Sequence, residues 1–237
     1  MNRNYLYGFF AFLFISATYI FICTINPEKA YKLALETGPI EICSVVCYIL
    51  CACLLFYLFF YSKSITGIYL FRTNKNYFYL LLCLFFLISL GEEISWGQRI
   101  LDIKTPEWLN EKNMQHEINV HNVGTLFTLF GVRINAARIF YLFVALFFVL
   151  IPIISRLSTK AQNIFKKINL PIAPLWIAPL FPINFVIYEL ILKRIIPVDS
   201  PRRLDETLEN NFALLFLVAS ISFYYFNKKN SSQPRAT

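Results

Sequence analysis

Charged residues are scarce in this chain, and their scarcity excludes an ordinary soluble globular protein. Only 15% of the 237 residues are Asp, Glu, Lys or Arg, whereas 57% are hydrophobic and 18% are aromatic. A soluble domain typically has about 25% charged residues. The composition therefore predicts an integral membrane protein.

Apolar runs long enough to cross a bilayer account for most of the sequence. A transmembrane helix needs roughly 20 apolar residues. The runs span residues 5–25, 39–61, 77–95, 136–154, 170–192 and 207–226. The first run lacks a small-residue cleavage site, so we expect a retained span and not a signal peptide. The sequence predicts an all-α polytopic fold with about six transmembrane helices, in one domain over 1–226, followed by a disordered cytoplasmic tail over 227–237.

Acidic residues are absent from one of the two alternating sets of segments between these runs, when charged residues near the ends of a run are counted with the segment that they adjoin. That side has eleven of the 22 Lys and Arg residues, whereas the other has the remaining eleven, all fourteen acidic residues and both histidines. The purely basic side has its charges in short loops beside the spans, which favours a cytoplasmic location. We therefore expect both termini in the cytoplasm. The net charge of +8 then reflects attraction to membrane lipids and not a nucleic-acid partner.

One long extracytoplasmic segment, 97–135, separates the third and fourth runs and is a candidate cap. Within it, Thr105, Pro106 and Glu107 predict the capped start of a short helix. The apolar stretch 123–130 is too short to cross the membrane, so we expect it to lie at the interface or to re-enter. Four prolines in the first half of the fifth run predict a kinked or broken helix.

Two adjacent carboxylates, Glu92 and Glu93, end the third run. Neighbouring carboxylates at a membrane boundary lose hydration and repel each other, so water, a base, a shared proton or a metal must offset the cost. One interpretation is an interfacial pair that faces water beside Arg99. The other is a functional acid, base or metal ligand.

Only two histidines are present, and their spacing limits what they can do together. His116 and His121 are five residues apart, which places them about 140° apart on a helix and excludes the helical two-histidine face of a zinc protease. A loop could still bring both to one ion, and either could act as a general base. The alternative is ordinary polar loop surface.

Other carboxylates lie at the same predicted depth in different helices. Glu41 is one turn into the second run, where an acid needs a partner. Glu206 and Glu209 open the sixth run, where the helix dipole already explains acidic residues. However, their i, i+3 spacing stacks like charges that a cation or arginine would relieve.

Three segments together resemble a group of uncharacterised bacterial multi-pass membrane proteins: 36–41, 91–99 with the sequence GEEISWGQR, and 113–122. The resemblance implies a bacterial inner-membrane protein. The glutamate pair Glu92–Glu93, which Arg99 follows, also has a partial similarity to the first motif of CAAX-type intramembrane proteases. That resemblance implies a glutamate that activates water and a histidine that positions it or stabilises charge.

The leading hypothesis is a membrane-embedded hydrolase of a lipid or lipid-linked substrate, with a divalent metal such as zinc as a candidate cofactor. The predicted catalytic residues are Glu92, Glu93 and His121. The predicted substrate-binding residues are Trp96, Gln98, Arg99 and Asn122. The candidate metal ligands are Glu41, Glu92, His116, His121, Glu206 and Glu209.

Two non-catalytic alternatives stay open. The first is a transporter whose carboxylates bind protons or cations along a path, although the middle of each span is expected to be apolar or aromatic. The second is an accessory protein that binds a partner through its long loop.

Overall fold

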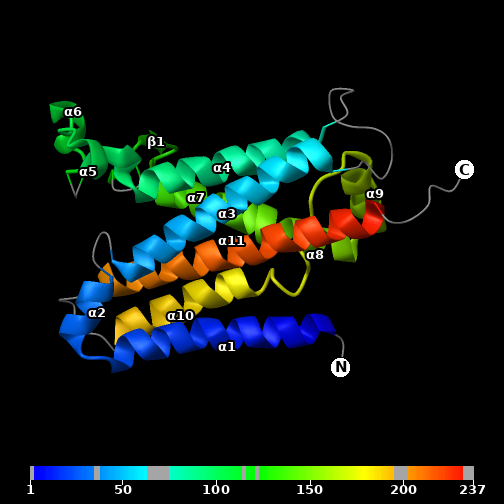
Figure 1. Cartoon of the computed structure of the whole chain (residues 1–237), viewed down its shortest axis with the longest axis horizontal. Coiled ribbons are helices and arrows are strands. Elements are labelled where there is room, and N and C mark those ends of the chain that lie inside the picture. Colours follow the sequence, from blue (N-terminus) through cyan, green and yellow to red (C-terminus); the bar gives the residue numbers. More distant parts are fainter. Residues whose placement is uncertain are drawn as a thin grey trace, which may run out of the picture.

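Helices make up most of the chain in the computed structural model, which describes residues 3–34, 38–62, 75–113, 116–120, 123–194 and 202–231 (Figure 1). The expectation of a mainly helical chain is confirmed. The α-helices are α1 (Arg3–Thr24), α2 (Pro27–Leu33), α3 (Pro39–Tyr61), α4 (Tyr77–Glu93), α5 (Gln98–Leu101), α6 (Glu107–Asn110), α7 (Ala136–Val144), α8 (Ile151–Leu157), α9 (Thr159–Lys167), α10 (Leu180–Arg194) and α11 (Arg202–Ser231). The remaining elements are a 3-10 turn η2 (Ser95–Gly97), a π-helical segment η3 (Ala145–Leu150) and two antiparallel strands, β1 (Phe127–Leu129) and β2 (Val132–Ile134).

Among the described helical segments, four are long and apolar enough to cross a membrane. They are Leu6–Thr24, Pro39–Tyr61, Ala136–Leu157 and Leu204–Lys228. Many of their large apolar side chains face outward, such as Phe9 and Phe10, which are 56% and 57% exposed. Outward apolar surface on long helices is what lipid contact requires. The chain is thus a membrane protein in its general architecture.

The long helices pack side by side, with α3 and α11 at the centre (Figure 1). α3 packs against both α4 and α11, and α11 also contacts α1 and α10. The ring of Phe216 on α11 lies 5.2 Å from Phe86, 5.0 Å from Phe148 and 5.4 Å from Phe181, measured between centroids. These rings join α4, α10, α11 and the π-helical segment in one aromatic core. The α1 start and the α11 end lie at one end of this bundle, whereas α2, α5 and α6 lie at the other.

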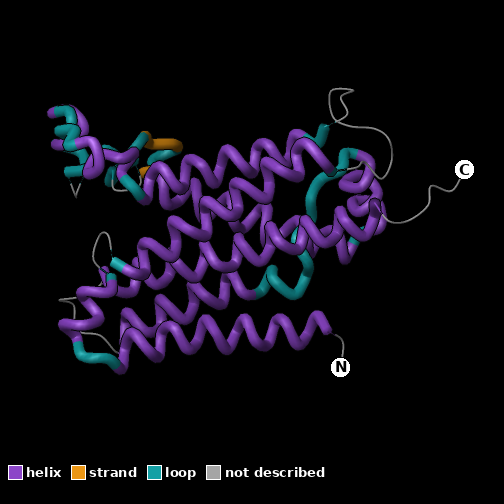
Figure 2. The backbone as a smooth tube through the Cα atoms, viewed as in Figure 1, coloured by secondary structure: helices purple, strands orange, loops and turns teal. Residues whose placement is uncertain are grey.

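The fifth apolar run is a broken helix, as its prolines predicted. Residues 170–179 form turns and irregular backbone, and regular helix begins only at Leu180, directly after Pro179 (Figure 2). Proline lacks the N–H that a helical ladder needs and clashes with the preceding turn. Consequently α10 contains only 15 residues.

The predicted sixth run lies in α11, which is longer than predicted at its C-terminal end. α11 continues through Ser231, so residues 227–231 are helical and do not belong to a disordered tail. Asn227 donates a hydrogen bond from Nδ2 to the Tyr79 hydroxyl at 2.6 Å, which ties this last turn to α4. The remainder of the predicted tail, 232–237, lies outside the described residues.

The long segment 97–135 has structure of its own. The predicted short helix is present as α6, but Pro106 and not Thr105 occupies the N-cap position, without a side-chain capping bond. The apolar stretch 123–130, for which we expect an interfacial or re-entrant position, contains the strand β1. In β1, apolar and polar residues alternate as Phe127, Thr128 and Leu129, which favours a strand over a helix. The two-residue turn Phe130–Gly131 then lets β2 pair with β1.

Candidate functional site

The two adjacent glutamates of the GEEISWGQR segment make different contacts. Glu92 accepts a hydrogen bond from the Trp96 indole N–H at 2.8 Å and another from the Val120 backbone N–H at 2.6 Å. Both of its oxygens therefore hold the cap: one fixes the turn that follows α4, and the other fixes the loop that leads to β1. Adjacent helical positions point about 100° apart, so Glu93 is directed elsewhere.

The turn after α4 has a strained backbone. Ser95, Trp96 and Gly97 have φ values of 46°, 54° and 78°, so three consecutive residues occupy the left-handed region. This conformation costs about 1–2 kcal/mol for each non-glycine residue. A Cβ on Gly91 would lie 2.9 Å from the Trp96 ring, which shows how closely the indole covers the helix end. The Glu92 bond and this packing hold the turn in place.

Side chains of the cap are joined by a second set of hydrogen bonds around buried Ser95. The Ser95 hydroxyl donates to Glu117 Oε2 at 2.5 Å, and Asn119 Nδ2 donates to the same oxygen at 2.8 Å. Asn113 Nδ2 in turn donates to Asn119 Oδ1 at 2.8 Å. Ser95, Asn113 and Asn119 are at most 2% exposed. This network fixes the cap loop against the end of α4.

Gln98 and His116 also take part in holding the cap. Gln98 accepts from the Ile118 backbone N–H at 2.6 Å and donates to Thr105 Oγ1 at 2.8 Å. Thr105 donates to the His116 carbonyl at 2.5 Å, and His116 Nδ1 lies 2.9 Å from Asn110 Oδ1. The His116 side chain is exposed. These bonds give Gln98 and His116 structural roles, which were not predicted.

Glu93 interacts electrostatically with carboxylates from two other helices. It is partly buried, and the negative charges of Glu209, Glu206 and Glu41 disfavour its ionised form, with a smaller effect from Glu92. Glu41 comes from the first turn of α3 and is 8% exposed. We refer to Glu41, Glu93, Glu206 and Glu209 as the carboxylate cluster. The structure thus places Glu41, Glu206 and Glu209 within electrostatic range of Glu93, and the sequence placed these residues at one depth on three helices.

Polar side chains lie beside this cluster on the neighbouring helices. Tyr48 of α3 is within electrostatic range of Glu93 and Glu209, and Tyr141 of α7 is within range of Glu209. The Tyr188 hydroxyl of α10 donates a hydrogen bond to Asp205. Like charges near one another repel, and a shared proton or a bound cation relieves that repulsion. The cluster is thus suited to hold and exchange protons.

Two amides inside the bundle form a buried network that the sequence interpretation missed. Asn184 of α10 and Asn211 of α11 are both 0% exposed. Asn211 Nδ2 donates to Asn184 Oδ1 at 3.2 Å and to Thr18 Oγ1 at 2.9 Å, and the Tyr19 hydroxyl donates to Asn184 Oδ1 at 2.9 Å. The signal was present, because Asn inside an apolar run is a marker of interhelical hydrogen bonding. The expectation of apolar or aromatic span interiors is wrong for these amides.

Several predicted site residues fall outside the described structure. His121 and Asn122 lie in an undescribed segment, and the Arg99 side chain is also undescribed. In the described part of the chain, no group of three or more His, Cys, Asp or Glu residues is arranged to hold a metal ion. The zinc hypothesis, whose candidate ligands include the undescribed His121, therefore stays a prediction.

Comparisons with known proteins provide no relatives. No protein-family model matches the chain, and neither curated proteins nor solved structures give a match.

Proposed function

We propose that this protein is a membrane-embedded hydrolase that acts on a lipid or lipid-linked substrate, with Glu93 as its general base. The observation that carries the proposal is the convergence of Glu41, Glu206 and Glu209 on Glu93 at the end of the bundle. Carboxylates that share protons can divide the two tasks of hydrolysis. One takes a proton from the attacking water, and a protonated neighbour gives one to the leaving group.

The two glutamates of the pair have separate roles in this proposal. Both Glu92 oxygens accept hydrogen bonds that hold the cap, so Glu92 is a positioning residue. Trp96 and Gln98 likewise hold the cap, which leaves Arg99 and Asn122 as the proposed substrate contacts. His121 is proposed to assist Glu93, and a divalent metal is proposed only if His121 joins the carboxylate cluster.

The site requires a particular placement in the membrane. We propose six crossings of a bacterial inner membrane. Four are the long apolar helical segments named above, and the other two are α4 and the fifth run, which contains α10. α4 has 17 residues and extends about 26 Å, close to the hydrocarbon thickness. The α1 start and the α11 end share one end of the bundle, as an even number of crossings demands (Figure 1). The cap then faces the outside.

Topology can be tested by labelling introduced cysteines in intact cells with a membrane-impermeant maleimide. Lys104→Cys in the cap is expected to react in intact cells, whereas Lys160→Cys in α9 is expected to react only after lysis. Wild-type protein, with its six native cysteines, provides the background. Labelling of Lys160→Cys alone in intact cells would reverse the proposed orientation.

The enzymatic proposal can be tested with purified protein in vesicles made from a bacterial polar lipid extract. Mass spectrometry should detect released fatty acid, headgroup or lyso-lipid with the wild type and far less with Glu93→Gln. Elemental analysis of the same samples decides whether a divalent metal is present and lost in the variant. Equal product from both proteins contradicts the role of Glu93, and no product from either contradicts hydrolysis of these lipids.

A second candidate function is proton or cation transport, because the same carboxylate cluster could bind either. Vesicles with an internal pH dye distinguish the two. Proton entry that depends on Glu93 without any lipid product supports transport.

A further inference from the structure

The β1–β2 hairpin has one apolar face and one polar face. Phe127 pairs with Ile134, Thr128 with Arg133, and Leu129 with Val132. Directly paired residues in an antiparallel ladder share a face, and successive pairs alternate. One face therefore has four apolar side chains, from the first and third pairs. The other face has Thr128 and Arg133.

The apolar face of the hairpin is not covered by the described protein. Phe127, Leu129 and Val132 are each about half exposed, at 50%, 52% and 50%. Phe130, in the turn, is 98% exposed. It has a φ of 48°, unusual for a bulky residue, and is followed by Gly131 with a φ of 78°. An isolated two-stranded hairpin is only marginally stable in water, so this element needs a surface to rest on.

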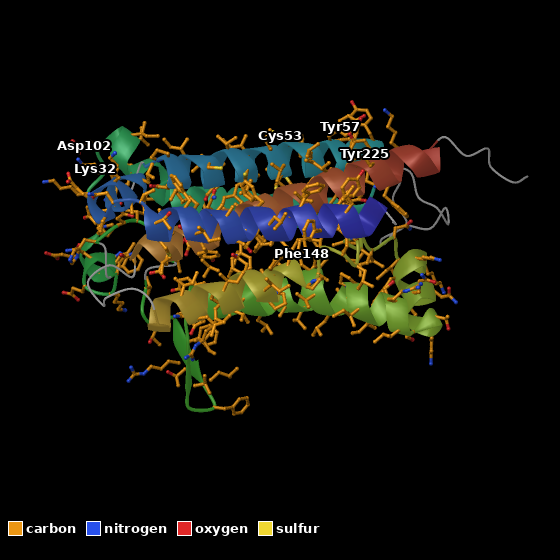
Figure 3. All side chains as sticks on the ribbon, turned by 90° about the horizontal axis from the view of Figure 1, so that it is seen from below. Lys32, Cys53, Tyr57, Asp102, Phe148 and Tyr225 are labelled. Carbon is orange, nitrogen blue, oxygen red and sulfur yellow. The ribbon has the colours of Figure 1, made fainter. Side chains whose placement is uncertain are left out.

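The position of the hairpin identifies that surface. Only Asn135 separates β2 from α7, and it caps α7 by accepting a hydrogen bond from the Arg138 N–H. The candidate span Ala136–Leu157 begins immediately afterwards. The hairpin consequently lies at the membrane boundary. Figure 3 shows it as the green strands that project sideways from one end of the bundle, across the direction of the helices.

We propose that this hairpin inserts its apolar face and Phe130 into the lipid interface of the leaflet beside the cap. A ribbon that lies across the helix axes at the start of a span is parallel to the bilayer plane. Its apolar face then meets the acyl boundary, as in interfacial amphipathic elements. Arg133 on the opposite face can remain among the lipid phosphates. This placement of the hairpin follows from the span that starts at Ala136 and not from the proposed hydrolysis.

The test places an environment-sensitive fluorescent amino acid at Phe130 of the full-length chain by amber suppression, with Thr128 as the matched control on the polar face. Protein in phosphatidylethanolamine and phosphatidylglycerol nanodiscs is then exposed to two quenchers. One is aqueous iodide, and the other is a lipid with a spin label high on its acyl chain. Elution on size exclusion identifies variants that have not folded, and Phe127 is then labelled in place of Phe130.

The expected result is strong lipid quenching and a several-fold weaker iodide effect at 130 than at 128. Equal iodide quenching at both positions, without lipid quenching at 130, would place the hairpin in water and overturn the proposal. Protection of 130 from both quenchers would show that a protein surface covers it, and would overturn the proposal as well. A repeat with nanodiscs that hold a single chain then shows whether that surface is a second copy.

Discussion

Glu93→Gln is expected to lower lipid hydrolysis by roughly 10²–10⁴-fold, the usual contribution of a general acid or base, while raising thermal stability. An ionised Glu93 has the cost of repulsion from Glu209, Glu206 and Glu41. A protonated Glu93 has the free-energy cost of taking up a proton from neutral solution. Glutamine has neither cost. The expected gain is about 0.5–2 kcal/mol, measured as a higher midpoint of heat-induced loss of monodisperse protein in detergent.

Glu92→Gln is the informative comparison, because its stability should change in the opposite direction. The amide keeps one acceptor oxygen, but its NH₂ group faces either the Trp96 or the Val120 N–H. Loss of one charge-assisted hydrogen bond costs about 1.5–3 kcal/mol, so the midpoint should fall. Exposed Glu111→Gln serves as the neutral control. If Glu93→Gln destabilised the protein as Glu92→Gln does, Glu93 would be a structural residue and not a functional one.

Asn211→Asp is expected to destabilise the bundle by on the order of 3–5 kcal/mol, because it places an uncompensated charge among fully buried groups. The new oxygen would face Thr18 Oγ1 or Asn184 Oδ1, both of which now accept from the Asn211 amide. This amide joins α11 to α1 and α10 through hydrogen bonds. The thermal midpoint in detergent measures the loss.

Two further variants show whether the charge or the lost hydrogen bonds cause this effect. Asn211→Ala removes the bonds without a charge and should cost only about 1–3 kcal/mol. Asn163→Asp introduces the same charge on the exposed face of α9 and should be neutral. A similar loss for Asn211→Ala and Asn211→Asp would assign the effect to the lost hydrogen bonds and not to the charge.

The sequence predicted those features of the fold that depend on local composition. Long apolar runs gave the helical architecture, and the prolines before Leu180 predicted the broken fifth run, because proline disrupts a helix wherever it stands. The C-terminal limit of α11 was harder to predict. Residues 227–231 are polar, and the start of this stretch is held by a hydrogen bond between Asn227 and Tyr79, which is 148 residues away.

By itself, the sequence determined that this is a helical membrane protein, because composition is a local property, and it predicted that Glu41, Glu93, Glu206 and Glu209 lie at one depth. Only the tertiary structure decided which groups each of the two adjacent glutamates contacts. Glu92 turns toward the cap and Glu93 toward the other members of the carboxylate cluster. These directions depend on which helix packs against each face of α4. The Asn184–Asn211 network likewise appears only when α10 and α11 pack together, since their partners are distant in sequence.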